Sequence, residues 1–121
     1  MEDTFRANAA ISRYRVVKYH STQGFVISAT AKDGNLTGVS QNATTASGDT
    51  IRVRQLGKSL VTISTSVTKG IPLIVSDSDG RVSNAGGATG DGTIGVAEEG
   101  TAGASGTSGD QITCFLQIRR A

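Results

Sequence analysis

Along most of its length, this chain alternates apolar and polar residues in short stretches separated by small polar turns. In residues 50–56, Ile51 and Val53 are apolar while Arg52 and Arg54 are charged. Because successive side chains of a β-strand point to opposite faces, this pattern directs the aliphatic pair into a core and the arginines into solvent. No window of about eleven residues has helical periodicity, so the sequence predicts an all-β protein. The predicted strands are residues 13–19, 25–30, 35–40, 50–56, 60–67, 71–76, 80–85, 93–98 and 111–120.

The second half of the chain repeats the first in outline. Residues 38–53 (GVSQNATTASGDTIRV) and 95–116 (GVAEEGTAGASGTSGDQITCFL) both begin with Gly-Val, pass through a loop of small polar residues and reach Gly-Asp before a strand. This order predicts a small sandwich or barrel of about eight to nine short strands, in two pseudo-symmetric halves of about four strands each. The repeat matches Val17 with Ile74, Gly24 with Gly80, Gly38 with Gly95 and Gly48 with Gly109.

The residues that define this repeat have structural explanations. Glycine in each Gly-Val pair permits a β-bulge or a close approach of two backbones. Aspartate in each Gly-Asp pair can accept hydrogen bonds from nearby backbone N–H groups. The loop at 98–109 contains nothing larger than threonine after its two glutamates, so we expect it to be exposed and mobile.

The first twelve residues precede the first predicted strand and contain one aromatic side chain, Phe5. We expect residues 1–12 to form a flexible N-terminal arm that becomes ordered on a partner, with Phe5 as its anchor, or else a frayed tail. Residues 13–121 are then predicted to form a single β domain.

The composition narrows the classes of protein only slightly. The 121 residues include 16 glycines and one proline, and their net charge of +2 does not by itself indicate a nucleic-acid partner. The longest apolar stretch, at 70–75, is far shorter than the roughly 20 residues that cross a bilayer. The first ten residues lack the basic and apolar regions of a signal peptide, so we expect cytoplasmic synthesis and no membrane contact. The only cysteine, Cys114, alternates with apolar neighbours and is predicted to be buried.

The sequence offers little of what an enzyme needs. His20 is the only histidine and is expected in a solvated turn, so neither a multi-histidine metal site nor a convincing triad can be assembled. DSDG at 77–80 lacks the glutamate that completes a calcium loop, and GGATGDG at 86–92 lacks the lysine and hydroxyl of a phosphate loop. We therefore expect no enzymatic activity, no metal and no cofactor.

Basic side chains are concentrated in the first part of the chain. Residues 1–70 contain nine Lys or Arg and four Asp or Glu, a surplus of five positive charges. Two predicted strands carry arginines at two-residue spacing, and such a stripe suits an acidic protein surface or a nucleic-acid backbone, or is simply a solvated face. Because few aromatic residues accompany these arginines, a base-stacking platform is poor and we expect no nucleic acid. The candidate contact residues are Arg13, Arg15, Arg52 and Arg54.

These motifs resemble those of the capsid cement or head decoration proteins of tailed bacteriophages. The resemblance rests on GVS and SGDTIRV within 38–53, on TKGIPLIV and DGRV within 68–82, and on IGVAEEG and GDQITCFL within 94–116. It covers residues 13–119. A K-G-x-P-hydrophobic stretch, a GVA strand followed by a Gly/Ser-rich loop, and a final GD strand recur in that family.

The resemblance implies a structural virion protein on the outer surface of an assembled capsid, where it bridges neighbouring major capsid proteins and resists internal DNA pressure. It also implies a homo-trimer on the shell, or a dimer at twofold positions. The family's N-terminal arm commonly contacts the shell, which would give Phe5 and Arg6 a role in partner binding. The alternative is a small carbohydrate- or protein-binding β module on the virion surface, with the loop at 98–109 meeting the ligand.

Overall fold

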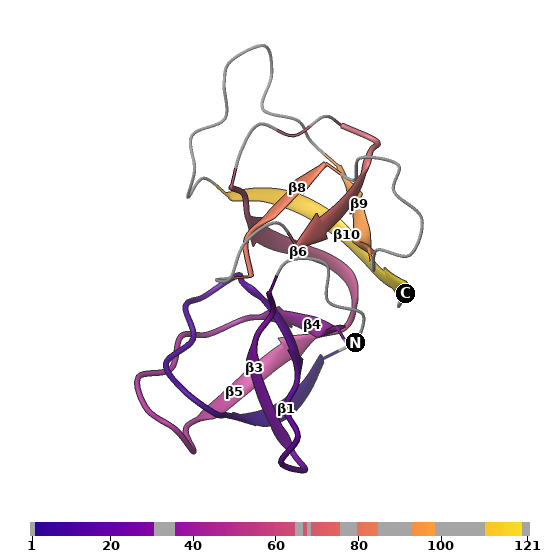
Figure 1. Ribbon diagram of the computed structural model, residues 1–121. Coiled ribbons are helices and arrows are strands. Elements are labelled where there is room, and N and C mark those ends of the chain that lie inside the picture. Colours follow the sequence, from indigo (N-terminus) through magenta and orange to yellow (C-terminus); the bar gives the residue numbers. More distant parts are fainter. Residues whose placement is uncertain are drawn as a thin grey trace.

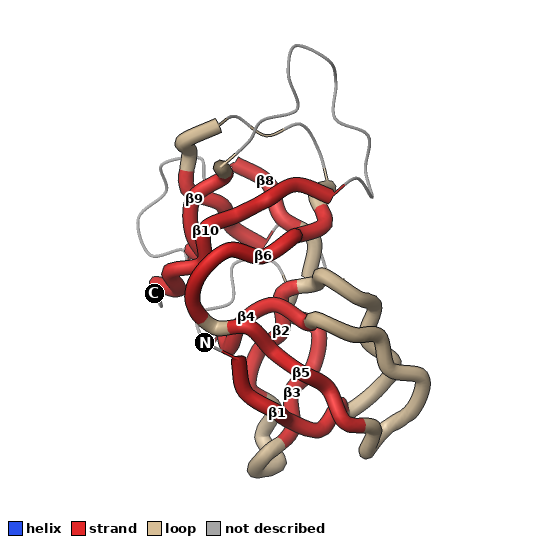
Figure 2. Tube along the Cα trace, turned by 180° about the vertical axis from the view of Figure 1, so that it is seen from behind, coloured by secondary structure: helices blue, strands red, loops and turns tan. Residues whose placement is uncertain are grey.

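The computed structural model describes residues 2–30, 36–64, 67, 69–75, 80–84, 93–98 and 111–119, and it confirms the all-β prediction. In this part of the chain ten strands form two sheets, one of them closed into a barrel, in place of the predicted eight to nine strands (Figures 1 and 2). The strands are β1 (Glu2–Ala7), β2 (Val16–Tyr19), β3 (Phe25–Ser28), β4 (Leu36–Ser40), β5 (Thr50–Arg54), β6 (Leu56–Thr62), β7 (Pro72–Val75), β8 (Val82–Asn84), β9 (Thr93–Ala97) and β10 (Gln111–Arg119).

The first half of the chain forms the closed barrel, in the order β1-β3-β2-β4-β5, with β5 returning to β1. Its pairs are antiparallel except for β1 with β3. The predicted alternation in β5 is confirmed, because Ile51 and Val53 are fully buried while Arg52 is exposed. The barrel core contains Ala7, Ile11, Val17, Val26, Ile51 and Val53, with Phe5 packed against it.

The second half forms a five-stranded sheet in the order β6-β10-β9-β7-β8, which both ribbon views show stacked on the barrel (Figures 1 and 2). The core of this sheet also includes barrel side chains. Val16 of β2 and Leu36 and Val39 of β4 belong to the same buried cluster as Leu73, Ile94 and Leu116. Strand β4 is buried along its whole length, as is typical of a strand covered by packed structure on both faces. The two halves are therefore joined by a shared hydrophobic core.

The predicted internal repeat is present in the topology. The order β1-β5-β4-β2-β3 in the barrel corresponds strand by strand to β6-β10-β9-β7-β8 in the sheet. Even the parallel pairing of β1 with β3 has a counterpart, an isolated parallel bridge between Ile63, just after β6, and Val82 in β8. Each repeat thus contains five strands, one more than the sequence indicated. One matched pair differs by a residue: Gly38 pairs with Val17 and Gly95 with Leu73, so Val17 corresponds to Leu73 and not to Ile74.

The glycines of the two Gly-Val pairs have the role that the sequence predicted. A Cβ atom on Gly38 would lie 2.3 Å from the Arg54 carbonyl oxygen, and one on Gly95 would lie 2.0 Å from the Phe115 carbonyl oxygen. The ladder register also shifts immediately after each glycine's partner, between Val17 and Lys18 and between Leu73 and Ile74. Both the close backbone approach and the bulge are therefore present in each repeat.

The prediction of an N-terminal arm is wrong for residues 2–7. They form β1, which pairs with β5 along five residues and with β3 along two, and so closes the barrel. The repeat gives the reason, since β1 is the counterpart of β6 and Phe5 is the counterpart of the buried Val61. Phe5 is half-buried and makes an edge-to-face contact with Tyr19, the ring centroids being 6.2 Å apart. Its ring thus anchors β1 to the barrel itself.

The Gly-Asp pair before β5 forms the predicted turn. The Asp49 carboxylate accepts hydrogen bonds from the backbone N–H groups of Thr45 and Ala46, each at 3.0 Å, and from the Thr45 hydroxyl at 3.2 Å. Because the backbone N–H of Thr45, followed by that of Ala46, stabilises the charged form, the pKa of Asp49 lies below its ordinary value of 3.8. The equivalent pair, Gly109 and Asp110, lies outside the described residues.

This turn gives a pH-dependent prediction. A carboxyl group whose pKa is lower in the folded state contributes stability above its unfolded pKa, and that contribution is lost as the pH falls through the folded value. Asp49→Asn should therefore be less stable than the wild type at pH 7, and the difference should shrink as the pH falls below about 4. Urea unfolding midpoints between pH 7 and pH 2.5 measure it. Parallel curves for the two proteins over this range would contradict the assignment.

Candidate interface between the two halves

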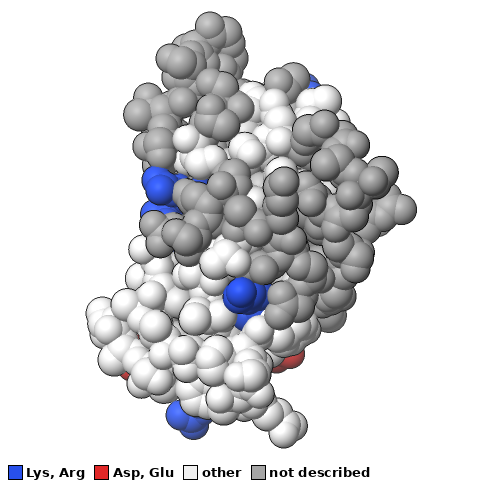
Figure 3. Space-filling model, in the orientation of Figure 1, with Lys and Arg blue, Asp and Glu red and all other residues white. Residues whose placement is uncertain are grey.

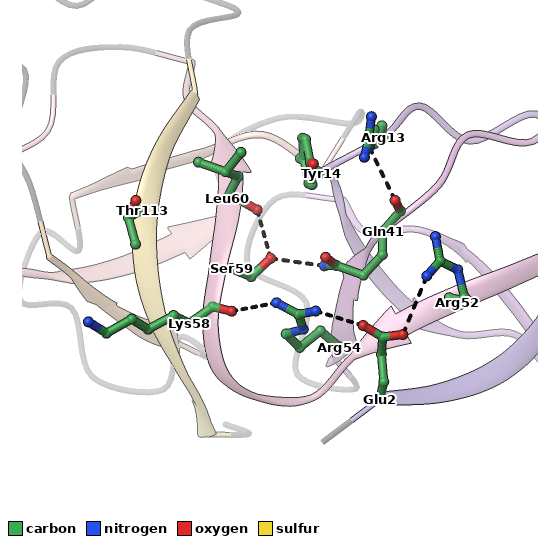
Figure 4. A pocket seen from close by; sticks show the side chains of 10 residues that line it. All are labelled: Glu2, Arg13, Tyr14, Gln41, Arg52, Arg54, Lys58, Ser59, Leu60 and Thr113. Carbon is green, nitrogen blue, oxygen red and sulfur yellow. Dashed lines mark hydrogen bonds and ion pairs between the residues drawn. The ribbon is translucent and has the colours of Figure 1, made fainter.

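A groove lies where the barrel meets the sheet, with a volume of about 450 Å³. Its walls come from β1, the turn before β2, the residue after β4, and strands β5, β6 and β10 (Figure 4). We call it the cationic groove, because four of its lining residues are Arg or Lys and one is acidic. The lining residues are Glu2, Arg13, Tyr14, Gln41, Arg52, Arg54, Lys58, Ser59, Leu60 and Thr113.

Glu2 connects two arginines of β5 at one side of the groove. Its carboxylate oxygens lie 2.8 Å from an Arg54 guanidinium nitrogen and 3.7 Å from one of Arg52. Arg54 also donates a hydrogen bond of 2.8 Å to the Lys58 carbonyl oxygen, so it spans from β1 to β6 (Figure 4). The hydrogen bond from Arg54, followed by the attraction of Arg54 and Arg52, lowers the pKa of Glu2. The field at this position therefore favours a carboxylate.

Arg13 and Tyr14 form the other side of the groove. Tyr14 has φ +60°, the one non-glycine residue with positive φ in the described part of the chain. Its backbone is held from both halves, because its N–H donates to the Ser40 carbonyl and its own carbonyl accepts from the Thr62 N–H, both at 2.9 Å. The Arg13 guanidinium lies 4.7 Å from the Tyr14 ring centroid, and its Nε donates to the Gln41 carbonyl at 3.2 Å. An exposed arginine is thus held in one orientation.

The floor of the groove is polar and hydrogen-bonded. The Gln41 side-chain amide donates to the Ser59 hydroxyl at 2.9 Å and to the Val39 carbonyl at 3.1 Å. Ser59 in turn donates to the Leu60 carbonyl at 2.9 Å. Gln41 and Ser59 are both buried, so this network joins β6 to the residue after β4 beneath the arginines (Figure 4).

Beside the groove, several apolar side chains lie on the exposed face of the second sheet, next to Lys58, which pairs with Phe115. Phe115 of β10 pairs with Val96 of β9, which pairs with Pro72 of β7, and Leu60 of β6 lies on the same face. Phe115 is 42% exposed and Val96 38% exposed, far above what a core residue shows. We call these four residues the outer sheet face. A second groove, of about 510 Å³, lies against it and is lined by Pro72, Thr93, Gly95, Val96, Gln117 and Ile118.

The two repeats use this face differently. By register, Val16 and Val39 in the first repeat correspond to Pro72 and Val96 in the second. Val16 and Val39 are fully buried in the shared core, whereas Pro72 and Val96 are exposed. In the first repeat, this surface packs against the second repeat. In the second repeat, the equivalent surface is exposed to solvent.

The structure brings three of the six predicted contact residues together. Arg13, Arg52 and Arg54 line the cationic groove. Phe5 packs on the barrel, and Arg6, which is exposed, reaches the Gly48 carbonyl at 3.4 Å. Arg15 is half-buried and its backbone pairs with Ser40.

Sequence reasoning missed the remaining groove residues and the outer sheet face. The sequence predicts an arm at Glu2 and a turn between two strands at Lys58, and no pattern in it indicates that Gln41 is a buried polar residue. Phe115 could have been found from the alternation of its strand, since it lies between the apolar Cys114 and Leu116. Alternation alone would place Val96 on the face of Ile94, and the register shift beside Gly95 is what turns Val96 outward. Figure 3 shows one face of the molecule, on which the described Lys and Arg side chains lie in separate patches. The four cations of the groove come from the turn before β2, from β5 and from β6, so their gathering depends on the junction between the halves.

The remaining chemical candidates have structural roles or lie outside the described residues. Cys114 is fully buried as predicted, and burial, with a smaller effect of Glu98, raises the pKa of its thiol to about 12. His20 lies in the turn after β2, where its Nδ1 accepts a hydrogen bond from the Thr22 N–H at 3.1 Å. Residues 77–79, 86–92 and, apart from Glu98, the loop at 98–109 are not among the described residues.

The described residues contain no group of three or more His, Cys, Asp or Glu side chains placed to hold a metal ion. They also contain no helix long and apolar enough to cross a membrane.

The fold defines a tandem-repeat, all-β protein with a barrel and a sheet joined by one core. It is similar to a solved structure of the head fiber gp8.5 N base in bacteriophage phi29, with a TM-score of 0.72 and 18% sequence identity. The similarity covers 97% of this chain and 93% of that chain, so the two share the fold over nearly their whole lengths. No family model matches the sequence, and no curated protein matches it.

Proposed function

We propose that this chain is a structural protein of a phage virion that binds the outer surface of the head and bridges neighbouring major capsid proteins. The observation that carries the proposal is the shared fold with the base of a phage head fiber, which extends over 97% of this chain. The resemblance of the sequence motifs to capsid cement proteins points to the same class of protein. The proposal includes no catalytic step, cofactor, nucleic acid or membrane.

The exposed surfaces of the molecule suit attachment and assembly. The outer sheet face is apolar and the cationic groove beside it is charged, a combination that is typical of a protein–protein contact. Many copies on one shell act together, so each needs only a modest interface.

The repeat also supports a homo-oligomer on the shell. Because Pro72 and Val96 correspond to Val16 and Val39, a second copy can cover them much as the second repeat covers the first. A head-to-tail contact of this kind generates a ring when the rotation closes. We propose a homo-trimer, with a dimer at twofold positions as the alternative that the stoichiometry on the shell decides.

Co-sedimentation with expanded, undecorated heads of the same phage tests the proposal. We expect the purified protein to pellet with the heads and to saturate at a fixed number of copies per shell, because the sites on an icosahedral shell are finite and equivalent. That number distinguishes threefold from twofold positions. Heads of an unrelated phage are the control.

Absence of binding by folded protein would contradict attachment to the head. The alternative, a carbohydrate- or protein-binding module on the virion surface, would then be favoured by a specific ligand in a glycan or receptor screen.

A further inference from the structure

We propose that the cationic groove binds the carboxylates of an acidic polypeptide segment, and that Arg13 is the side chain that captures them. This inference deepens the proposed function, on which it rests, by naming the chemistry of the head-protein segment that the groove contacts. Three features of the groove support it: its charge, the constrained backbone beneath Arg13, and the residues that surround that arginine.

The groove has more positive charge than its own carboxylates neutralise. Glu2 pairs with Arg52 and Arg54, and Lys58 pairs at 3.2 Å with Glu98, which does not line the groove. Four cations against two carboxylates leaves a surplus of two positive charges. Among the described residues no ion pair involves Arg13, which is exposed. Arg13 therefore has guanidinium N–H groups directed to solvent beside an already cationic surface.

Glu2 shows what kind of group the groove accepts. It reaches the groove from β1 and lies between the two β5 arginines, with one oxygen 2.8 Å from Arg54 and the other 3.7 Å from Arg52. One carboxylate of the chain thus already occupies one side of the groove. The side at Arg13 offers an incoming carboxylate the same chemistry.

The backbone beneath Arg13 is held in a conformation that most side chains avoid. Positive φ at a residue such as Tyr14 is uncommon and persists only where the surrounding structure imposes it, and such residues concentrate at binding sites. Here two hydrogen bonds hold it, one donated to the Ser40 carbonyl in the barrel half and one accepted from the Thr62 N–H in the sheet half. The resulting turn places the Tyr14 ring against the Arg13 guanidinium, so little side-chain freedom is lost when a ligand binds.

The surroundings of Arg13 favour a polypeptide over a nucleic acid. A single-stranded nucleic acid is usually bound by aromatic rings on which its bases stack, and the one ring in the groove, Tyr14, is engaged by Arg13. Leu60, 36% exposed, adds an apolar wall that suits an aliphatic side chain flanking an acidic one. The charge complement of this groove is therefore an acidic peptide.

The first experiment uses the isolated protein and does not depend on the head. ¹⁵N-labelled protein is titrated with hexaglutamate, with hexaglutamine and with a thymidine hexanucleotide. We expect saturable shifts at the Arg13 Nε–H and at Gln41 and Ser59 with hexaglutamate, none with hexaglutamine, and weaker binding of the hexanucleotide. Arg13→Gln should weaken hexaglutamate about tenfold, the scale of one charge-assisted hydrogen bond. Arg6→Gln is the matched control and should bind as the wild type does, because Arg6 is an exposed arginine outside the groove.

Glu2→Gln distinguishes a binding role of these residues from a merely structural one, because only a binding role predicts a gain in affinity. Removing the internal carboxylate leaves Arg52 and Arg54 without their partner, so hexaglutamate should bind this variant more tightly than the wild type. The proposal is overturned if Glu2→Gln binds hexaglutamate no more tightly than the wild type does. It is also overturned if the wild type binds hexaglutamine as well as hexaglutamate, or the hexanucleotide more tightly. Equal losses of hexaglutamate affinity in Arg13→Gln and Arg6→Gln would overturn it too.

The second experiment separates this inference from the proposed function. In co-sedimentation with heads, Arg13→Gln should need about tenfold more protein for half-saturation. Lys69→Gln, at an exposed lysine outside the groove, should match the wild type. If the wild type does not bind heads while hexaglutamate binding behaves as expected, the proposed function fails and the groove's specificity stands. If the wild type and Arg13→Gln bind heads equally, the groove is not the contact and the proposed function stands.

Discussion

Gly38→Ala should leave the protein largely unfolded under conditions in which the wild type is stable. The added Cβ would lie 2.3 Å from the Arg54 carbonyl oxygen and 2.7 Å from Cγ1 of Val53, both on the paired strand β5. Backbone cannot yield as a flexible side chain can, so β4 and β5 must separate, which opens the barrel. We expect a loss of more than about 4 kcal/mol, a large part of the 5–15 kcal/mol that stabilises a typical domain.

Two other glycines distinguish close approach from backbone conformation. Gly24 has φ +83° but nothing within 4 Å of its added Cβ, so Gly24→Ala should cost only about 1–2 kcal/mol. Gly95 combines φ +150° with a Cβ position 2.0 Å from the Phe115 carbonyl oxygen, so Gly95→Ala should be as severe as Gly38→Ala. Circular dichroism and urea unfolding of the three variants measure this. Similar, mild losses in all three would contradict the close approach of backbones in the two repeats.

Local patterns in the sequence were enough to predict most of this fold. Nine of the ten described strands were placed, with ends that differ by a few residues, because alternating Val, Ile and Thr between glycine turns is a local signal. The repeat was visible because its turns need the same residues: Gly38 and Gly95 where backbones approach, and Gly-Asp before a strand. These requirements act within a few residues along the chain or between adjacent strands.

The strand that was missed depends on distant parts of the chain. EDTFRA at residues 2–7 has one aromatic and no Val or Ile, so its own composition favours no strand. Its pairing with Thr50–Arg54 and with Phe25 supplies the hydrogen bonds that hold it, and neither partner is near in sequence. The topology of the second repeat, in which β6 fills the same place, is the signal that would have predicted a fifth strand.

The candidate site was predictable only in part for the same reason. The solvent-facing positions of Arg52 and Arg54 follow from alternation. Their meeting with Arg13 and Lys58 follows from the way the barrel docks on the sheet, which depends on the shared core and on the positive φ of Tyr14. No short stretch of sequence encodes that arrangement.

The shared core leads to the other prediction with a large expected effect. Leu36 lies on barrel strand β4 but is fully buried in the cluster that forms the core of the sheet. Leu36→Ala removes buried methyl groups and leaves a cavity there, which should cost about 2–5 kcal/mol in the free energy of unfolding. Leu56→Ala, at a leucine that is 50% exposed, should change stability by less than about 1 kcal/mol and is the matched control.

Cys114 reports whether the cavity weakens both halves together. Its thiol is buried in the second sheet, so a thiol reagent reaches it only when that sheet opens. If the halves unfold as one unit, a loss of 2 kcal/mol or more should raise the Cys114 labelling rate by about thirtyfold or more. The test compares the increase in the Cys114 labelling rate with the loss in the free energy of unfolding measured by urea unfolding. A lower unfolding midpoint with an unchanged labelling rate would mean that the barrel opens alone, since coupling through Leu36 requires the sheet to open with it.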